Sequence, residues 1–211
     1  MNYEKIRKEV LEASLKSNKL GLIHGTSGNI SVRDKENNVF AITPSGREYE
    51  TMKPEDIAIC DLDGNWIEGE YKPSIEAMMH AGVYKNRDDV NAVVHTHSKF
   101  ATIMSMRDGS LPRATLPACM YYPINIAAPF YMAGTQELAD CVVETLGDRS
   151  DVVIIKNHGL LATGKDIDAA MTCAIYTEEG AEAAYYCVLA GFDDYIPEEE
   201  AINLNKSCKG E

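Results

Sequence analysis

Three of the five histidines in this chain follow apolar runs that are typical of buried strands. His95 and His97 lie one residue apart after residues 93–94, and His158 comes soon after a second run at residues 152–155. Alternate side chains of a strand point to the same face, so His95 and His97 can share one ion. The three imidazoles therefore predict a metal centre. Zinc is the first choice, although imidazole also suits iron, nickel, copper and cobalt.

A carboxylate at the start of a predicted helix could complete this centre. Residues 73–84 are predicted to be helical, with Ser74 as the N-cap and Glu76 in the first turn. Glu76 could bind the metal, or it could only accept hydrogen bonds from backbone N–H groups at the helix start. His80 lies one helical turn after Glu76, on the same side. It could be a ligand, a hydrogen-bond partner of the site or a histidine of the core.

Two loops are rich in small polar residues. Loops of this kind can direct backbone N–H groups and hydroxyl groups toward an anion. Most of them are only turns, however, and the residues alone leave both interpretations open. The first loop contains Thr26, Ser27, Gly28 and Asn29, and the second contains Thr43, Ser45 and Gly46.

The composition narrows the possible partners. The chain of 211 residues has a formal net charge of −13, which disfavours nucleic acid and anionic membranes. An anionic substrate must therefore be held by local donors. The six cysteines form no C-x-x-C pair, and we expect them to be free thiols. Because the sequence has no apolar run of transmembrane length and no signal peptide, we expect a cytoplasmic protein.

The order of the predicted elements indicates one α/β domain over residues 1–211, with three layers of the α+β kind. Its centre is expected to be a mostly antiparallel sheet flanked by helices. Residues 111–133 are expected to be irregular with short strand pieces, and the acidic tail from about residue 193 to be mobile. The predicted helices cover residues 2–19, 73–84, 98–106, 135–146 and 166–190, and the predicted strands cover residues 30–32, 39–43, 57–60, 66–67, 93–97, 152–158 and 160–164.

Five segments together resemble, in order and spacing, the motifs of the class II aldolase/adducin family. They are residues 25–31, 43–46, 73–76, 95–97 and 157–159. The resemblance extends to about residue 190 and implies the class II aldolase fold. Within the family it is strongest for the L-fuculose-1-phosphate aldolase branch.

The resemblance implies a role for each of these segments. One Zn²⁺ ion per subunit is bound by His95, His97 and His158, and Glu76 is both a metal neighbour and the catalytic acid or base. Asn29 hydrogen-bonds the oxygen on which negative charge develops. Family members are homotetramers with the site at a subunit interface. The residues that match the phosphate-binding loops are Thr26, Ser27, Gly28, Asn29, Thr43, Ser45, Gly46 and Ser74.

The implied reaction is the cleavage of a ketose 1-phosphate to dihydroxyacetone phosphate and a short aldehyde. The substrate would resemble L-fuculose 1-phosphate or a 5-deoxypentulose 1-phosphate, and the ion would stabilise the enediolate. Glu76 would transfer protons at the carbon if burial raises its pKa towards neutral. Two other enzymes are alternatives: an L-ribulose-5-phosphate 4-epimerase and a methylthioribulose-1-phosphate dehydratase. The epimerases tend to carry aspartate in place of Glu76. A third alternative is a non-enzymatic adducin-like module, which should lack the metal ligands.

The aldehyde side of the site departs from the family pattern. The family places a proton-donating tyrosine of a neighbouring subunit at a position that falls on Leu116 here. Tyr121 or Tyr122, a few residues later, could take its place. Ile75 stands where the family has a second phosphate-binding serine, so one donor is missing. The sequence therefore leaves the aldehyde and the stereochemistry open.

Overall fold

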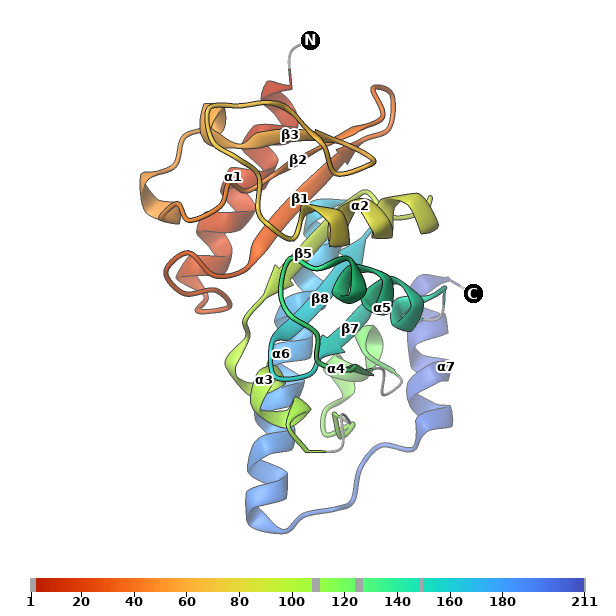
Figure 1. Cartoon of the computed structure of the whole chain (residues 1–211). Coiled ribbons are helices and arrows are strands. Elements are labelled where there is room, and N and C mark those ends of the chain that lie inside the picture. The colour runs from red at the N-terminus through yellow and green to blue at the C-terminus, as the bar shows by residue number, and fades with distance from the viewer. Residues whose placement is uncertain (1–2, 108–110, 124–126, 149, 211) are drawn as a thin grey trace.

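A sheet of eight strands forms the centre of the structure, in the order β4-β3-β2-β1-β5-β8-β7-β6. The structure is a computed structural model that describes residues 3–107, 111–123, 127–148 and 150–210. All paired neighbours run antiparallel except β6 and β7, so the predicted mostly antiparallel sheet is confirmed (Figure 1). The strands are β1 (Asn29–Asp34), β2 (Val39–Ile42), β3 (Ala58–Asp61), β4 (Trp66–Glu68), β5 (Ala92–Thr96), β6 (Ala127–Ala128), β7 (Val152–Ile155) and β8 (Gly159–Gly164).

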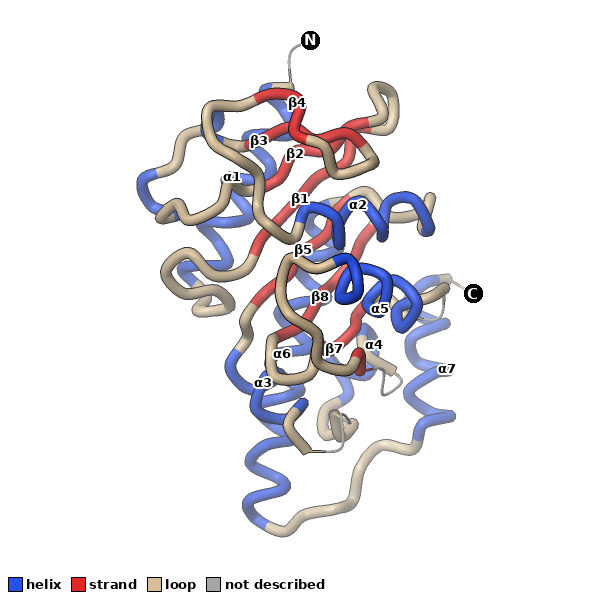
Figure 2. Tube along the Cα trace, in the orientation of Figure 1, coloured by secondary structure: helices blue, strands red, loops and turns tan. Residues whose placement is uncertain are grey.

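Helices cover both faces of this sheet and produce the three predicted layers (Figure 2). Helices α1, α3 and α6 pack on one face, and α2 and α5 pack on the other. Among the described residues, no helix is long and apolar enough to cross a membrane. The helices are α1 (Glu4–Lys19), α2 (Ala77–Asn86), α3 (Lys99–Ser105), α4 (Leu116–Tyr121), α5 (Gln136–Leu146), α6 (Ile167–Ala190) and α7 (Glu198–Lys209), and the 3-10 turns are η1 (Tyr49–Thr51) and η2 (Pro54–Asp56).

The two faces explain why the central strands are apolar throughout. In β5, Ala92 and Val94 belong to the core under α1 and α6, whereas Val93 belongs to the core under α2 and α5. Both sets of side chains are buried because both faces are covered. His95 continues the row of Val93, since alternate residues share a face. Its side chain is thus directed to the layer that contains α2.

The helix that carries Glu76 begins later than predicted. Its first helical residue is Ala77, and Glu76 occupies the N-cap position. The hydroxyl of Ser74 accepts the N–H of Glu76 at 3.2 Å, and the carbonyl of Ser74 accepts the N–H of Ala77 at 3.1 Å. Ser74 therefore closes a turn before the helix instead of capping the helix itself.

Two other segments also differ from the prediction. The segment predicted to be irregular contains the short helix α4, which Thr115 caps by accepting the N–H of Ala118. The tail predicted to be mobile contains α7, which packs against α4. There, Ala201 is fully buried and the side chain of Asn205 donates to the carbonyl of Met120. The start predicted for the first helix, at residue 2, lies outside the described residues.

The N-cap of α6 gives a direct test of how local sequence stabilises this fold. Asp166 accepts the N–H of Ala169 at 2.8 Å, as an N-cap side chain does. We expect Asp166→Ala to lower the free energy of unfolding by about 1 kcal/mol, because an N–H group at the helix start loses its partner. Urea unfolding measures this loss. The control is Asp168→Ala, which removes an exposed first-turn acid that does not cap the helix and should cost only about 0.3–0.5 kcal/mol.

Candidate metal centre and active site

Four predicted ligands, distant in sequence, come together in the fold. One ligand atom from each of Glu76, His95, His97 and His158 lies within 4.8 Å of all the others. Nε2 of His95 lies 3.3 Å from Oε2 of Glu76 and 3.3 Å from Nε2 of His158. Nε2 of His158 lies 3.5 Å from Oε1 of Glu76. The four side chains can therefore bind one ion together.

Two neighbouring strand ends position the histidines. His95 lies within β5, and His97 follows directly after the strand ends. His158 lies in the tight turn between β7 and β8 and is not part of a strand. The preceding residue, Asn157, has a φ of 58°. Asparagine adopts this left-handed conformation more readily than most residues.

The glycine after His158 is required by the close approach of these two strand ends. A Cβ atom at Gly159 would lie 2.0 Å from the carbonyl oxygen of Thr96 and 3.1 Å from Cα of His97. Any side chain at this position would push the β7–β8 turn away from β5. The absence of a side chain at Gly159 therefore allows His158 to lie beside His97.

The chemistry of the cluster fits a divalent cation. Two of its buried atoms, Oε1 of Glu76 and Nε2 of His97, have no hydrogen-bond partner among the described residues. Buried polar atoms are nearly always paired, so these two indicate a missing ligand. Nδ1 of His95 donates to the carbonyl of Leu160 at 2.8 Å, which leaves Nε2 directed at the cluster. Metal-binding histidines are commonly held in this way.

The protonation of two of the three imidazoles suits this role. Burial, together with the nearby charge of His95, lowers the pKa values of His97 and His158 to about 4, so both imidazoles are neutral. Burial would raise the pKa of Glu76, but the charge and hydrogen bond of His95 outweigh it and hold that pKa below its usual range. Burial lowers the pKa of His95, but the carboxylate of Glu76 raises it by more. The condition that burial brings the pKa of Glu76 towards neutral is therefore not met, and Glu76 is a carboxylate.

The polar loops adjoin this cluster. Nδ2 of Asn29, at the start of β1, donates to Oε2 of Glu76 at 2.8 Å. The N–H of Ser74 donates to the carbonyl of Thr43 at 3.0 Å, and the Thr43 hydroxyl accepts the N–H of Ile30 at 3.3 Å. The structure therefore brings the three predicted phosphate-binding segments together, beside the metal ligands.

The predicted phosphate-binding residues differ in what they can offer. Thr26, Ser45 and Gly46 are exposed. The hydroxyl of Ser27 donates to the carbonyl of His24 and accepts its N–H, so it closes its own loop. The buried Thr43 hydroxyl is bonded to the backbone as well. We therefore expect Ser27 and Thr43 to shape the loops and the exposed residues to contact a ligand.

Comparison with known proteins agrees with this geometry. Residues 8–185 match the family described as "Class II Aldolase and Adducin N-terminal domain". The chain belongs to the class II aldolase and adducin family. A "5-deoxy-D-ribulose 1-phosphate aldolase" from Bacillus thuringiensis serovar kurstaki is 40% identical over 210 residues, which cover 100% of this chain and 98% of that protein.

Two further class II aldolase relatives support the assignment. An "L-fuculose phosphate aldolase" from Methanococcus maripaludis is 40% identical over 161 residues, which cover 76% of this chain and 86% of that protein. A solved structure of an "L-fuculose 1-phosphate aldolase" superposes with a TM-score of 0.88 at 30% identity and covers 99% of this chain and 98% of that chain. The predicted class II aldolase fold is thus confirmed.

Sequence reasoning missed one residue of this class II aldolase site. Tyr49 is 4% exposed, and its hydroxyl lies 2.8 Å from the carbonyl oxygens of both Ser27 and Gly28. Burial raises the pKa of Tyr49, so the hydroxyl keeps its proton and donates it to these carbonyls. Tyr49 therefore stabilises the first polar loop through these two hydrogen bonds. Its place in a short charged stretch, about twenty residues after that loop, gives no signal for this contact.

The two tyrosines predicted as proton donors lie in the layer of α6. Tyr121 stacks on Tyr176, with ring centroids 5.2 Å apart, and Tyr122 is 2% exposed within the core. Leu116, the position matched by the family's tyrosine, is exposed at the start of α4. Both tyrosines thus lie in the layer of α6, whereas the side chain of His95 is directed to the layer of α2.

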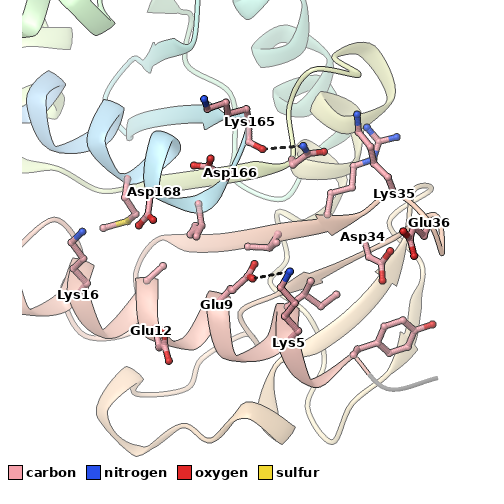
Figure 3. Close-up of a pocket in the computed structure, with 18 residues that line it drawn as sticks. Lys5, Glu9, Glu12, Lys16, Asp34, Lys35, Glu36, Lys165, Asp166 and Asp168 are labelled. Carbon is pink, nitrogen blue, oxygen red and sulfur yellow. Dashed lines mark hydrogen bonds and ion pairs between the residues drawn. The ribbon is translucent and has the colours of Figure 1, made fainter.

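A large groove lies apart from the metal ligands, between α1, β1 and the start of α6 (Figure 3). It has a volume of about 920 Å³ and is lined by charged side chains of both signs. Lys5 pairs with Glu9 at 3.9 Å, and Asn91 donates to the carbonyl of Lys165 at 2.9 Å. No metal-binding cluster lies among its lining residues, so it is not the candidate active site.

Proposed function

We propose that this chain is a zinc-dependent sugar-phosphate aldolase. It would cleave a ketose 1-phosphate, with a 5-deoxypentulose 1-phosphate and L-fuculose 1-phosphate as the first candidates, to dihydroxyacetone phosphate and a short aldehyde. One observation carries the proposal: the hydrogen bond from Asn29 to Glu76 joins a four-ligand cluster to the polar loops. Such a site suits a substrate that carries a carbonyl group and a phosphate near each other. The names of the two aldolase relatives support the same substrate class.

Glu76 carries the proton chemistry in this proposal, and Asn29 orients its carboxylate. When bound, the cation supplies Lewis-acid stabilisation of the negative charge that develops as the carbon–carbon bond breaks. In the condensation direction, the Glu76 carboxylate removes a proton from the carbon of the dihydroxyacetone phosphate half. In the cleavage direction, it first takes up a proton from water and then gives that proton to the same carbon. Because its pKa is held low, Glu76 begins the condensation direction as a base. The amide of Asn29 fixes the orientation of that carboxylate.

Short-range donors would hold the phosphate despite the charge of −13. The exposed Thr26 and Ser45 offer hydroxyl groups, and Gly46 offers a backbone N–H group. Gly46 has a φ of 68°, a conformation that favours glycine in such a loop. Hydrogen bonds to a charged phosphate are roughly twice as strong as those between neutral groups, so a few donors suffice.

Tyr49 should affect the affinity for phosphate more than the chemistry. We expect Tyr49→Phe to raise the inhibition constant of inorganic phosphate and the KM about tenfold, with kcat nearly unchanged. Two loop carbonyls lose their partner at a cost of about 1–2 kcal/mol, and 1.4 kcal/mol corresponds to a factor of ten. The control is Tyr195→Phe, which removes a hydroxyl that bonds the carbonyl of Phe192 in another loop. An unchanged phosphate constant in Tyr49→Phe contradicts this role.

The assembly also belongs to the proposal. We propose that residues 1–211 form one domain and that four copies form a homotetramer with the site at a subunit interface. Large exposed apolar side chains beside the second polar loop and before α5 support this arrangement, since a second copy would bury them. Light scattering coupled to size-exclusion chromatography gives the mass that tests it. These side chains are Ile75, Met78, Phe130, Tyr131 and Met132.

The function can be tested with the purified protein and a panel of phosphorylated ketoses. We expect about one zinc ion per subunit by metal analysis and release of dihydroxyacetone phosphate from 5-deoxy-D-ribulose 1-phosphate or L-fuculose 1-phosphate. Formation of an epimer from L-ribulose 5-phosphate would favour the epimerase instead, and loss of water from methylthioribulose 1-phosphate would favour the dehydratase. A chain that binds no metal and acts on none of these sugars would be an adducin-like module.

A further inference from the structure

His80 is a fully buried histidine that is not one of the four metal ligands. Both of its ring nitrogens have close partners. Nε2 lies 2.6 Å from Oδ1 of Asn29, and Nδ1 lies 2.6 Å from the hydroxyl of Ser31. That hydroxyl in turn lies 2.6 Å from the hydroxyl of Tyr84. A continuous row of hydrogen bonds therefore runs from Tyr84 through His80 to Asn29.

Donor and acceptor chemistry fixes the direction of every bond in this row. The carboxylate of Glu76 can only accept, so Nδ2 of Asn29 donates to it and Oδ1 of Asn29 turns toward His80. Because Oδ1 can only accept, Nε2 of His80 must carry the proton. Nδ1 of the neutral ring is then an acceptor for the hydroxyl of Ser31, and Ser31 accepts from Tyr84.

His80 remains neutral in this environment. Burial, followed by the nearby charge of His95, lowers its pKa to about 3. Neutral imidazole has one donor and one acceptor, which matches the two partners that the geometry requires. Any buried histidine needs a partner at each nitrogen, and here those partners form a row of side chains that ends at Glu76.

We infer that His80 is a positioning residue that holds the amide of Asn29 with its NH₂ group toward Glu76. Turning that amide over would place its oxygen against the carboxylate and its NH₂ group against the N–H of His80. Both contacts would be repulsive, and both partners would be left unsatisfied in a buried site. His80 thereby sets the orientation of the carboxylate that transfers the proton. The inference rests on the proposed function, because it assigns this control to the aldolase reaction.

A matched pair of substitutions separates the two ring nitrogens. In His80→Gln, the amide nitrogen can reach the place of Nε2 and donate to Asn29, whereas in His80→Asn the shorter amide reaches only the place of Nδ1. We expect His80→Gln to keep kcat near that of the unaltered protein and His80→Asn to lose about 10–100-fold, as for other groups that orient a ligand of a metal site. Thermal unfolding of both variants shows that each is folded, so a difference in kcat reflects positioning.

Nitrogen spectroscopy provides a readout that does not depend on activity. In protein with ¹⁵N-labelled histidine, the signal that disappears in His80→Gln should be that of a neutral ring protonated at Nε2. A ring protonated at Nδ1 overturns the inference, and so does a His80→Asn variant that is as active as His80→Gln. If the unaltered protein cleaves none of the ketose phosphates, the proposed function fails first. Failure of the proposed function and failure of the role of His80 are therefore distinguishable.

Discussion

Replacing His95 with alanine is expected to remove the metal and the activity together. His95 is fully buried and contacts Glu76 and His158 through Nε2, so it lies at the centre of the cluster. Loss of this ligand leaves two imidazoles and a carboxylate around a cavity. If the cation supplies several kcal/mol of transition-state stabilisation, kcat/KM should fall about a thousandfold or more.

Metal analysis and kinetics of the same preparation test this expectation. The zinc content should fall well below one ion per subunit, and added zinc should restore little activity. The control is His24→Ala, because His24 is exposed and outside the cluster and uses only its backbone to bond Ser27. It should retain its metal. A metal-free His95→Ala protein that still cleaves a ketose phosphate at the unaltered rate would contradict the Lewis-acid mechanism.

The sequence predicts that these histidines gather in one cluster because strand periodicity decides which way they point. His95 follows the alternation of β5, and the predicted sheet is confirmed. The partner strand that brings in His158 could be anticipated only as another apolar run that ends near a histidine. Its exact place in a turn depends on Asn157 and on the close approach at Gly159. These are contacts between segments that are distant in the chain.

What the sequence could not predict depends on such distant contacts. The pKa of Glu76 moves down and not up because His95 comes within 3.3 Å of its carboxylate, which local burial alone does not indicate. The acidic tail forms α7 because α4 offers it a surface on which Ala201 becomes buried. The role of Tyr49 likewise depends on the fold, which brings its hydroxyl to the carbonyl of Ser27 in the first polar loop.

Replacing Glu76 with glutamine should separate proton transfer from metal binding. The two side chains have nearly the same shape, and the amide oxygen of glutamine can still accept the hydrogen bond from Asn29. The three imidazoles remain, so we expect zinc to be retained. Glutamine cannot accept a proton at neutral pH, however. Exchange of the proton on the carbon of dihydroxyacetone phosphate should therefore fall about 10²–10⁴-fold, the usual contribution of a positioned acid or base.

Proton exchange isolates this step because it needs no aldehyde partner and so does not depend on the residue that protonates the aldehyde oxygen. Incubating each variant with dihydroxyacetone phosphate in D₂O and following deuterium uptake by NMR gives the rate. Zinc-replete Glu76→Gln with normal exchange would show that another group moves the proton. If zinc is lost as well, Glu76 is needed as the fourth ligand. The exchange rate of His80→Asn should lie between those of the unaltered protein and of Glu76→Gln, because Glu76 is intact in this variant but less well oriented. This order of rates links the proton-transfer role of Glu76 to its orientation by Asn29.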